Sequence, residues 1–273
     1  MDLPEDHITK KTVVLRLPGM DEVGIRRDVE YRSDASGALT LDIYTPPGGD
    51  GATLHPAVLS VAGYPDPGME RILGCRYKEM GSSRSWGRLI AASGMAAVNY
   101  ANREPAADIR SVLRYLRENG ARLGIDSNRI GLLAVSGHGP LAMAALIDDR
   151  SEAPLRCAAL ICPLLLDLDG FTAVEEAAKT FRFANPAAGR TVDDLPPGTA
   201  LFIARAGQDS TPGLNETLDR FVAKALGRNL ELTLVSLPQA PHAFDLLHDH
   251  ESSREAIRAA LGFLRSHLRT APA

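Results

Sequence analysis

The sequence predicts a doubly wound α/β domain, and two patterns along the chain support this. From residue 57 onward, short unbroken apolar runs are each followed by a segment of helical periodicity, which is typical of parallel strands covered on both faces. The runs are Ala57–Ala62, Met95–Asn99, Ile130–Val135, Cys157–Cys162, Leu201–Ala206 and Leu230–Val235. In such a domain we expect the active site at the carboxyl ends of the strands.

The second pattern precedes these runs. Residues 12–18, 23–34 and 39–46 alternate between apolar and polar side chains, as the strands of an antiparallel hairpin do. The sequence therefore predicts an antiparallel N-terminal edge beside the parallel strands.

Apolar stripes at helical spacing predict three of the intervening helices. The stripes lie within residues 109–116, 214–222 and 257–264. Pro105 suits the first position of the first helix, and Gly120 suits the position just after its end. Ser252 and Glu255 have the spacing of a capping box at the start of the last helix.

Length and charge limit the class of protein. The chain has 273 residues, of which 45% are hydrophobic, so it can form one large domain over residues 1–273. The formal net charge is −4, and neither sign of charge gathers into a long run. We therefore expect neither nucleic acid nor a membrane surface as a partner, and the sequence leaves a homodimer open.

The cysteines and the N-terminal stretch point to a cytoplasmic protein. Cys75, Cys157 and Cys162 are odd in number and lack the spacing of a zinc site, so reduced thiols are expected. The first eleven residues are polar, with no apolar core of a signal peptide, and no stretch reaches about 18 apolar residues. A soluble, cytoplasmic protein is the expectation.

The most informative segment for function ends the third apolar run. Here a buried strand passes through Ala-Val-Ser-Gly-His-Gly directly into an alanine-rich helix. A serine in such a turn exposes its hydroxyl above the sheet, beside a helix N-terminus, which makes Ser136 a candidate nucleophile. The motif is irregular, because Ala134 and His138 stand where G-x-S-x-G has glycines, and Gly139 follows one place later.

A serine nucleophile needs a general base, and the base needs an acid that fixes its tautomer. His242 lies just after the last apolar run, and Asp209 lies just after the run before it. Both positions are strand carboxyl ends, and the order Ser136, Asp209, His242 is that of α/β hydrolases. Asp167 and Asp169, which follow the fourth run, are the alternative acids.

Acyl transfer also needs hydrogen-bond donors directed at the developing oxyanion. The backbone N–H of Gly137, next after the serine, is one candidate. The loop after the first apolar run supplies the other, for which we favour Tyr64, with Gly63 as the second choice.

His138 and a downstream histidine cluster need separate interpretations. His138 is two residues past the serine, and we expect it to pack or to contact substrate rather than to act as the base. His242, His248 and His250 do not match a known metal-ligand spacing, so no metal is predicted.

Taken together, these motifs resemble the α/β-hydrolase superfamily, and within it the carboxylesterase and dienelactone-hydrolase-related branch. The resemblance covers nearly the whole chain from Leu39 and rests on phrases such as LTLDIYTP, HPAVLSVAGYP, LGIDSNRIGLLAVSGHGP, ARAGQDSTPGLN and PHAFDL. It implies an eight-stranded, mostly parallel sheet, a Ser-His-Asp triad and no cofactor. Dienelactone hydrolases use a cysteine nucleophile where this chain has serine, so generic esterase activity is favoured.

The chain departs from this pattern in the loop after the first run, which lacks an HGGG-type sequence. Residues 163–196 form an insertion long enough for a small lid over the strand ends, and we expect one or two short helices there.

The leading hypothesis is hydrolysis of a small or medium carboxylic ester through an acyl-Ser136 intermediate. A thioesterase, amidase or cyclase could use the same triad. A third hypothesis is a catalytically silent α/β-hydrolase fold that binds a ligand.

Overall fold

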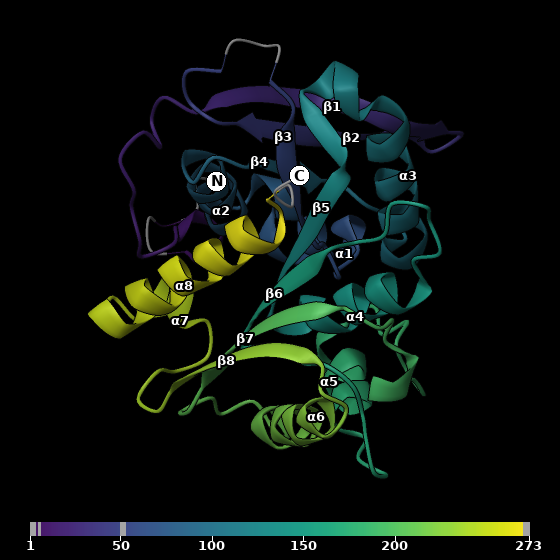
Figure 1. Cartoon of the computed structure of the whole chain (residues 1–273), viewed down its shortest axis with the longest axis vertical. Coiled ribbons are helices and arrows are strands. Elements are labelled where there is room, and N and C mark those ends of the chain that lie inside the picture. The colour runs from purple at the N-terminus through teal and green to yellow at the C-terminus, as the bar shows by residue number, and fades with distance from the viewer. Residues whose placement is uncertain (1–3, 5–6, 50–52, 270–273) are drawn as a thin grey trace.

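The computed structural model describes residue 4, residues 7–49 and residues 53–269, and its centre is one eight-stranded sheet (Figure 1). Residues 1–3 and 5–6 of the polar N-terminal stretch lie outside the described residues. The strands are β1 (Gly24–Asp34), β2 (Gly37–Thr45), β3 (His55–Ser60), β4 (Ala96–Tyr100), β5 (Ile125–Val135), β6 (Cys157–Ile161), β7 (Ala200–Ala206) and β8 (Glu231–Leu237).

The strand order in the sheet is β1-β2-β4-β3-β5-β6-β7-β8. The pairings β1–β2 and β2–β4 are antiparallel, and the five pairings among β3 to β8 are parallel. The six apolar runs are therefore confirmed as the parallel strands β3 to β8.

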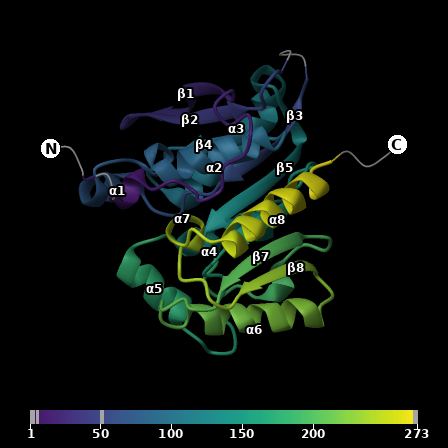
Figure 2. The same ribbon diagram turned by 90° about the vertical axis from the view of Figure 1, so that its left-hand side faces the viewer.

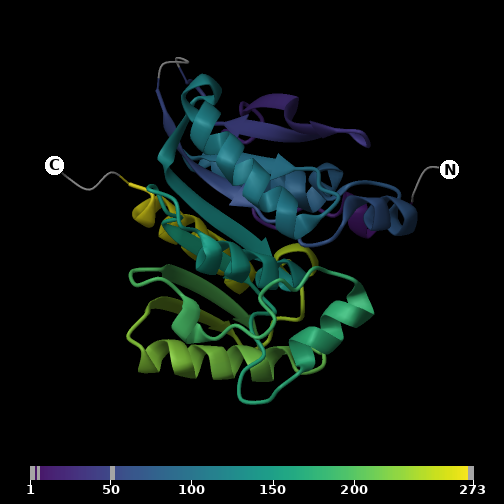
Figure 3. The ribbon, with the colours of Figure 1, turned by 90° about the vertical axis from the view of Figure 1, so that its right-hand side faces the viewer.

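Helices cover both faces of this sheet (Figures 2 and 3). One face packs on α3 (Pro105–Leu123), α4 (Gly139–Asp148) and α6 (Leu214–Gly227), and the other packs on α2 (Gly81–Ala92) and α8 (Glu251–His267). Successive strand side chains enter opposite layers: Leu59 joins the first core and its neighbour Val58 the second. This alternation is why the runs in β3 to β7 are largely apolar. The edge strand β8 is mostly exposed and alternates apolar with polar side chains.

The prediction for residues 12–18 was wrong, because this segment is not a strand. Its buried side chains Val13 and Leu15 pack in the core beneath α2 and α8. The backbone N–H of Val13 donates to Ser85 Oγ at 2.9 Å, and that of Val14 donates to the carbonyl of Asp245 at 2.9 Å. The alternation of apolar and polar residues over 12–18 thus arises because one side of an extended segment is buried, and not because the segment pairs with a strand of the sheet. Residues 23–34 and 39–46 do form the expected hairpin, as β1 and β2.

Two predicted helix ends were also wrong. Helix α3 continues through Gly120 and ends at Leu123, with Gly124 in the left-handed region at φ +74°. A side chain on Gly120 would lie 2.8 Å from the carbonyl of Ile125, so this glycine permits close packing on β5. Helix α8 has no Ser252 capping box, because the side chain of His250 accepts the hydrogen bond from the N–H of Ser252.

The predicted insertion at residues 163–196 contains α5 (Ala173–Phe181) and a short 3-10 helix, Val192–Asp194. Helix α5 lies toward the carboxyl ends of the strands (Figure 3). The N–H of Ala184 donates to the carbonyl of Gly63 at 2.8 Å, which ties the insertion to the loop after β3.

None of the helices in the described part of the chain has the length and apolarity that crossing a membrane requires.

Candidate active site

The sharp turn at the end of β5 carries Ser136. Its φ of +55° is left-handed, a conformation that costs a non-glycine residue about 1–3 kcal/mol. Ser136 begins the 3-10 helix Ser136–His138, and α4 follows at once from Gly139. A Cβ on Gly139 would lie 1.9 Å from the backbone oxygen of Leu164, so the close approach that demands glycine falls one place later than in G-x-S-x-G.

Three side chains from separate strand ends meet in one line of hydrogen bonds. Ser136 Oγ lies 2.8 Å from His242 Nε2, and His242 Nδ1 lies 2.5 Å from Asp209 Oδ2. Asp209 follows β7, and His242 lies in the loop after β8. The parallel arrangement of β5 to β8 is what brings residues more than a hundred positions apart into contact.

Asp209 is held as a carboxylate. Its side chain is fully buried, and burial works to raise its pKa. Hydrogen bonds from His242 and from the N–H of Thr211, the latter 2.9 Å from Oδ1, outweigh burial and keep the pKa below its ordinary value. An ionised acid at Nδ1 leaves Nε2 free to accept a proton from Ser136.

The alternative acids, Asp167 and Asp169, serve other contacts. Asp167 accepts hydrogen bonds from the N–H groups of Val174 and Glu175 at 2.9 and 2.8 Å, which caps the start of α5. Asp169 forms an ion pair with Lys224 at 2.7 Å.

The loop after β3 faces the serine turn and is held by two buried polar residues. Asp66 accepts from the N–H of Asn102 at 2.8 Å and from the N–H of Tyr77 at 3.0 Å. Asn102 Nδ2 in turn donates to the carbonyl of Tyr64 at 3.1 Å. Within the described residues, the Tyr64 N–H has no hydrogen-bond acceptor.

Gly63 and His138 connect this loop to the serine turn. The N–H of Gly63 donates to His138 Nδ1 at 2.7 Å, so this donor is engaged and Tyr64 is the better oxyanion candidate. Burial lowers the pKa of His138 to about 3, so the ring is neutral with its proton on Nε2. The ring packs on Tyr77, with centroids 4.4 Å apart, and on Tyr64 at 5.1 Å. His138 thus takes the packing role rather than that of a base.

Because Gly137 has no side chain, the aromatic rings of Tyr64 and Phe183 can pack against the serine turn. A Cβ on Gly137 would lie 2.5 Å from the hydroxyl oxygen of Tyr64 and 2.8 Å from Phe183 Cδ1. The Tyr64 and Phe183 rings are edge to face, with centroids 5.7 Å apart. Phe183 comes from the insertion, so this segment contributes directly to the surroundings of the serine turn.

Sequence reasoning missed four residues that shape this site: Asp66, Tyr77, Asn102 and Phe183. Asp66 and Asn102 share one recognisable signal, since each is a polar residue a few positions after a predicted strand. For Tyr77 and Phe183 the sequence carries no comparable signal, because their roles arise from contacts with distant segments.

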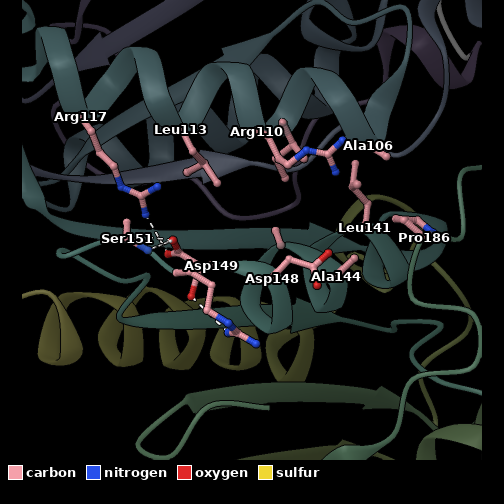
Figure 4. Close-up of a pocket in the computed structure, with 13 residues that line it drawn as sticks. Ala106, Arg110, Leu113, Arg117, Leu141, Ala144, Asp148, Asp149, Ser151 and Pro186 are labelled. Carbon is pink, nitrogen blue, oxygen red and sulfur yellow. Dashed lines mark hydrogen bonds and ion pairs between the residues drawn. The ribbon is translucent and has the colours of Figure 1, made fainter. Parts of the chain in front are cut away.

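The surface around the loop after β3 and around α4 has two hollows. One is a groove of about 530 Å³ beside Tyr64, and the other is a pocket of about 230 Å³ between α3 and α4 (Figure 4). None of Ser136, Asp209 and His242 lines either hollow. The walls of the second pocket include Arg110, Asp148 and Asp149.

No family model matches the sequence, and no curated protein matches it. Solved structures do. Apo Thermogutta terrifontis esterase 2 is similar with a TM-score of 0.64 and 20% identity, over 95% of this chain and 100% of that one. The same esterase with butyrate bound has a TM-score of 0.62 and 19% identity, over 92% and 95%. Esterase LipW from Mycobacterium marinum has a TM-score of 0.65 and 19% identity, over 91% and 83%. Together with the strand order, this likeness shows that the chain has the α/β-hydrolase fold.

Proposed function

We propose that the protein hydrolyses carboxylic esters through an acyl-Ser136 intermediate. The observation that carries the proposal is the hydrogen-bond line Ser136–His242–Asp209 at the carboxyl ends of the strands. A hydroxyl is a weak nucleophile at neutral pH, and an imidazole nitrogen at 2.8 Å with an ionised acid behind it is the arrangement that activates one.

Acylation follows from this geometry. His242 Nε2 takes the proton from Ser136 Oγ as the oxygen attacks the ester carbonyl carbon. The carbonyl oxygen becomes an oxyanion, for which the N–H groups of Gly137 and Tyr64 are the proposed donors. The intermediate collapses when His242 returns the proton to the leaving alcohol, which departs as the acyl-serine forms.

Deacylation repeats the steps with water. His242 takes a proton from water, the hydroxide attacks the acyl carbon, and the proton then passes to Ser136 Oγ as the acid leaves. Asp209 accepts the hydrogen bond from His242 Nδ1–H throughout and stabilises the imidazolium that forms twice in the cycle.

The solved structures support this proposal. Thermogutta terrifontis esterase 2 has been seen with butyrate and with propionate bound, and phosphorylated by paraoxon. We propose that this chain likewise acts on small or medium acyl groups, with residues 163–196 as a small lid that shields the acyl-enzyme through Phe183.

The test compares wild type with Ser136→Ala on p-nitrophenyl esters of increasing acyl length. We expect the variant to lose about 10⁴–10⁶-fold in kcat and to lose labelling by a fluorophosphonate. Ser210→Ala, which removes an exposed serine beside Asp209, is the matched control and should keep both.

A wild-type protein that neither hydrolyses esters nor labels at Ser136 would rule the proposal out. Thioesters and amides in the same plate separate an esterase from a thioesterase or an amidase with the same triad.

A further inference from the structure

We propose that the groove beside Tyr64 binds the charged end of the substrate, so that the preferred ester carries an apolar chain ending in a carboxylate. This inference rests on the proposed function and names a substrate class for it.

The groove lies between two segments that flank the oxyanion loop. One wall is α1 (Asp66–Leu73), which follows the loop directly, and the other is the end of α5 with the residue after it. Its volume of about 530 Å³ suits a small chain rather than a macromolecular partner.

The charge of the groove is of one sign. Arg71, Arg103 and Arg182 line it, and no acidic residue does. Arg103 is committed to Asp34, with both carboxylate oxygens 3.0 Å from its Nη2. Within the described residues, Arg71 and Arg182 are exposed and have neither an ion pair nor a side-chain hydrogen bond. In a chain of net charge −4, two unpaired guanidinium groups in one groove are complementary to an anion.

Arg182 also occupies a strained backbone position. It ends α5 with φ +62°, in the left-handed region where glycine is usual, and an arginine there costs conformational energy. The next residue, Phe183, turns inward against Tyr64. This position puts a cation in the lining of the groove, next in sequence to the ring that packs on Tyr64.

The rest of the groove is apolar. Ile72 on α1 is 69% exposed and Phe181 on α5 is 51% exposed, and both line the same groove. Met69 and Leu73 also line the groove. Apolar walls with arginines match a molecule that has a hydrocarbon part and an anionic end.

Tyr64 links the groove to Ser136. It lines the groove, and its hydroxyl oxygen would lie 2.5 Å from a Cβ on Gly137, the residue after the serine. Tyr64 is thus the residue shared by the groove and the surroundings of the serine turn, and in this proposal the apolar part of the substrate passes it between the arginines and Ser136.

The experiment uses pairs of esters that differ only in charge. For the acyl side, mono-p-nitrophenyl adipate is compared with p-nitrophenyl hexanoate, which replaces the terminal carboxylate with a methyl group. For the alcohol side, acetylated hydroxyhexanoate is compared with hexyl acetate. In one of the two pairs, we expect wild type to have a higher kcat/KM for the ester with the carboxylate than for its neutral counterpart.

Arg71→Gln and Arg182→Gln should each lower that preference by about three- to fivefold, and the double variant by about tenfold, the range of exposed ion pairs. The change should appear in KM for the charged ester, while the neutral ester keeps its kcat and KM. Added salt should lower the preference of wild type for the charged ester, because salt screens the attraction between the arginines and the carboxylate.

The matched control is Arg110→Gln. Arg110 is an exposed arginine in the separate pocket between α3 and α4 (Figure 4), and its loss changes net charge equally. A preference that falls as much in Arg110→Gln as in the groove variants would overturn the inference in favour of a general field effect.

If wild type has the same kcat/KM for the charged and the neutral ester in both pairs, the inference is overturned. The esterase proposal then still stands. If no ester reacts, the inference falls as well, and labelling of Ser136 then decides whether the proposed function falls with it.

Discussion

His138 Nδ1 accepts a hydrogen bond from the backbone N–H of Gly63 at 2.7 Å, which joins the serine turn to the loop that follows β3. The bond fixes the distance between the two segments that carry the proposed oxyanion donors, Gly137 and Tyr64. A histidine where G-x-S-x-G has glycine is thus accommodated by a specific acceptor role rather than by empty space.

The first prediction concerns this acceptor. In His138→Gln and His138→Ala the Gly63 N–H loses its partner at the Nδ1 position, which costs about 1–3 kcal/mol for a buried donor. We expect kcat for a short ester to fall about tenfold or more, with KM nearly unchanged. His138→Asn places an amide oxygen near the Nδ1 position and should restore most of kcat.

Steady-state kinetics and thermal melts of the three variants check this prediction. A purely structural role would lower stability in all three without separating asparagine from glutamine in kcat.

The second prediction concerns the acid. Asp209→Asn removes the charge that orients His242 and stabilises its protonated form, so kcat should fall about 10⁴-fold. Asp167→Asn is the matched control, because asparagine keeps an oxygen that can cap α5. Equal losses in the two variants would reject Asp209 as the catalytic acid.

The third prediction is a pH dependence of stability. Burial raises the pKa of Asp66 to about 6, against the favourable hydrogen bonds from Tyr77 and Asn102. The folded protein therefore holds this proton more tightly than the unfolded chain, whose carboxyl has a pKa of about 3.9. The contribution of Asp66 to the free energy of unfolding is greatest below about pH 4 and falls as the pH rises to about 6.

Urea unfolding of wild type and Asp66→Asn across this range isolates the effect. The difference in free energy of unfolding, wild type minus variant, should decrease by up to about 3 kcal/mol between pH 4 and pH 7. A difference that is constant or that increases with pH would show that Asp66 is not the group responsible.

The fourth prediction compares two glycines. A side chain at Gly139 would lie 1.9 Å from the Leu164 carbonyl oxygen, so Gly139→Ala must displace the serine turn or the start of the insertion. We expect a loss of stability of about 1–3 kcal/mol or more, as in overpacked cores, and a large loss of activity. Gly262 lies inside α8, and a Cβ added to it would meet no atom within 4 Å.

Gly262→Ala should therefore stabilise the protein by about 0.5–1 kcal/mol through helix propensity, with kcat unchanged. Denaturant midpoints for both variants test the pair, and a destabilised Gly262→Ala would show that α8 packs more tightly than the structure indicates.

The sequence predicted what depends on local pattern. Largely apolar runs identified β3 to β7, because strands covered on both faces carry mainly apolar side chains. The edge strand β8 is mostly exposed and alternates apolar with polar residues. The turn after β5 and the positions of Asp209 and His242 followed from the rule that parallel strands present their carboxyl ends at one edge. Where only one side of a segment is buried, the pattern was ambiguous, and residues 12–18 were therefore mistaken for a strand.

What the sequence by itself determined is the order of the elements and the residue types at the strand ends. Only the tertiary structure decided that Asp209 rather than Asp167 meets His242, that His138 is an acceptor for Gly63, and that Phe183 reaches the serine turn. The physical reason is that hydrogen bonds and side-chain packing depend on distances of a few ångströms between segments far apart in the chain. Local periodicity fixes how each segment folds but not which distant side chains it will touch.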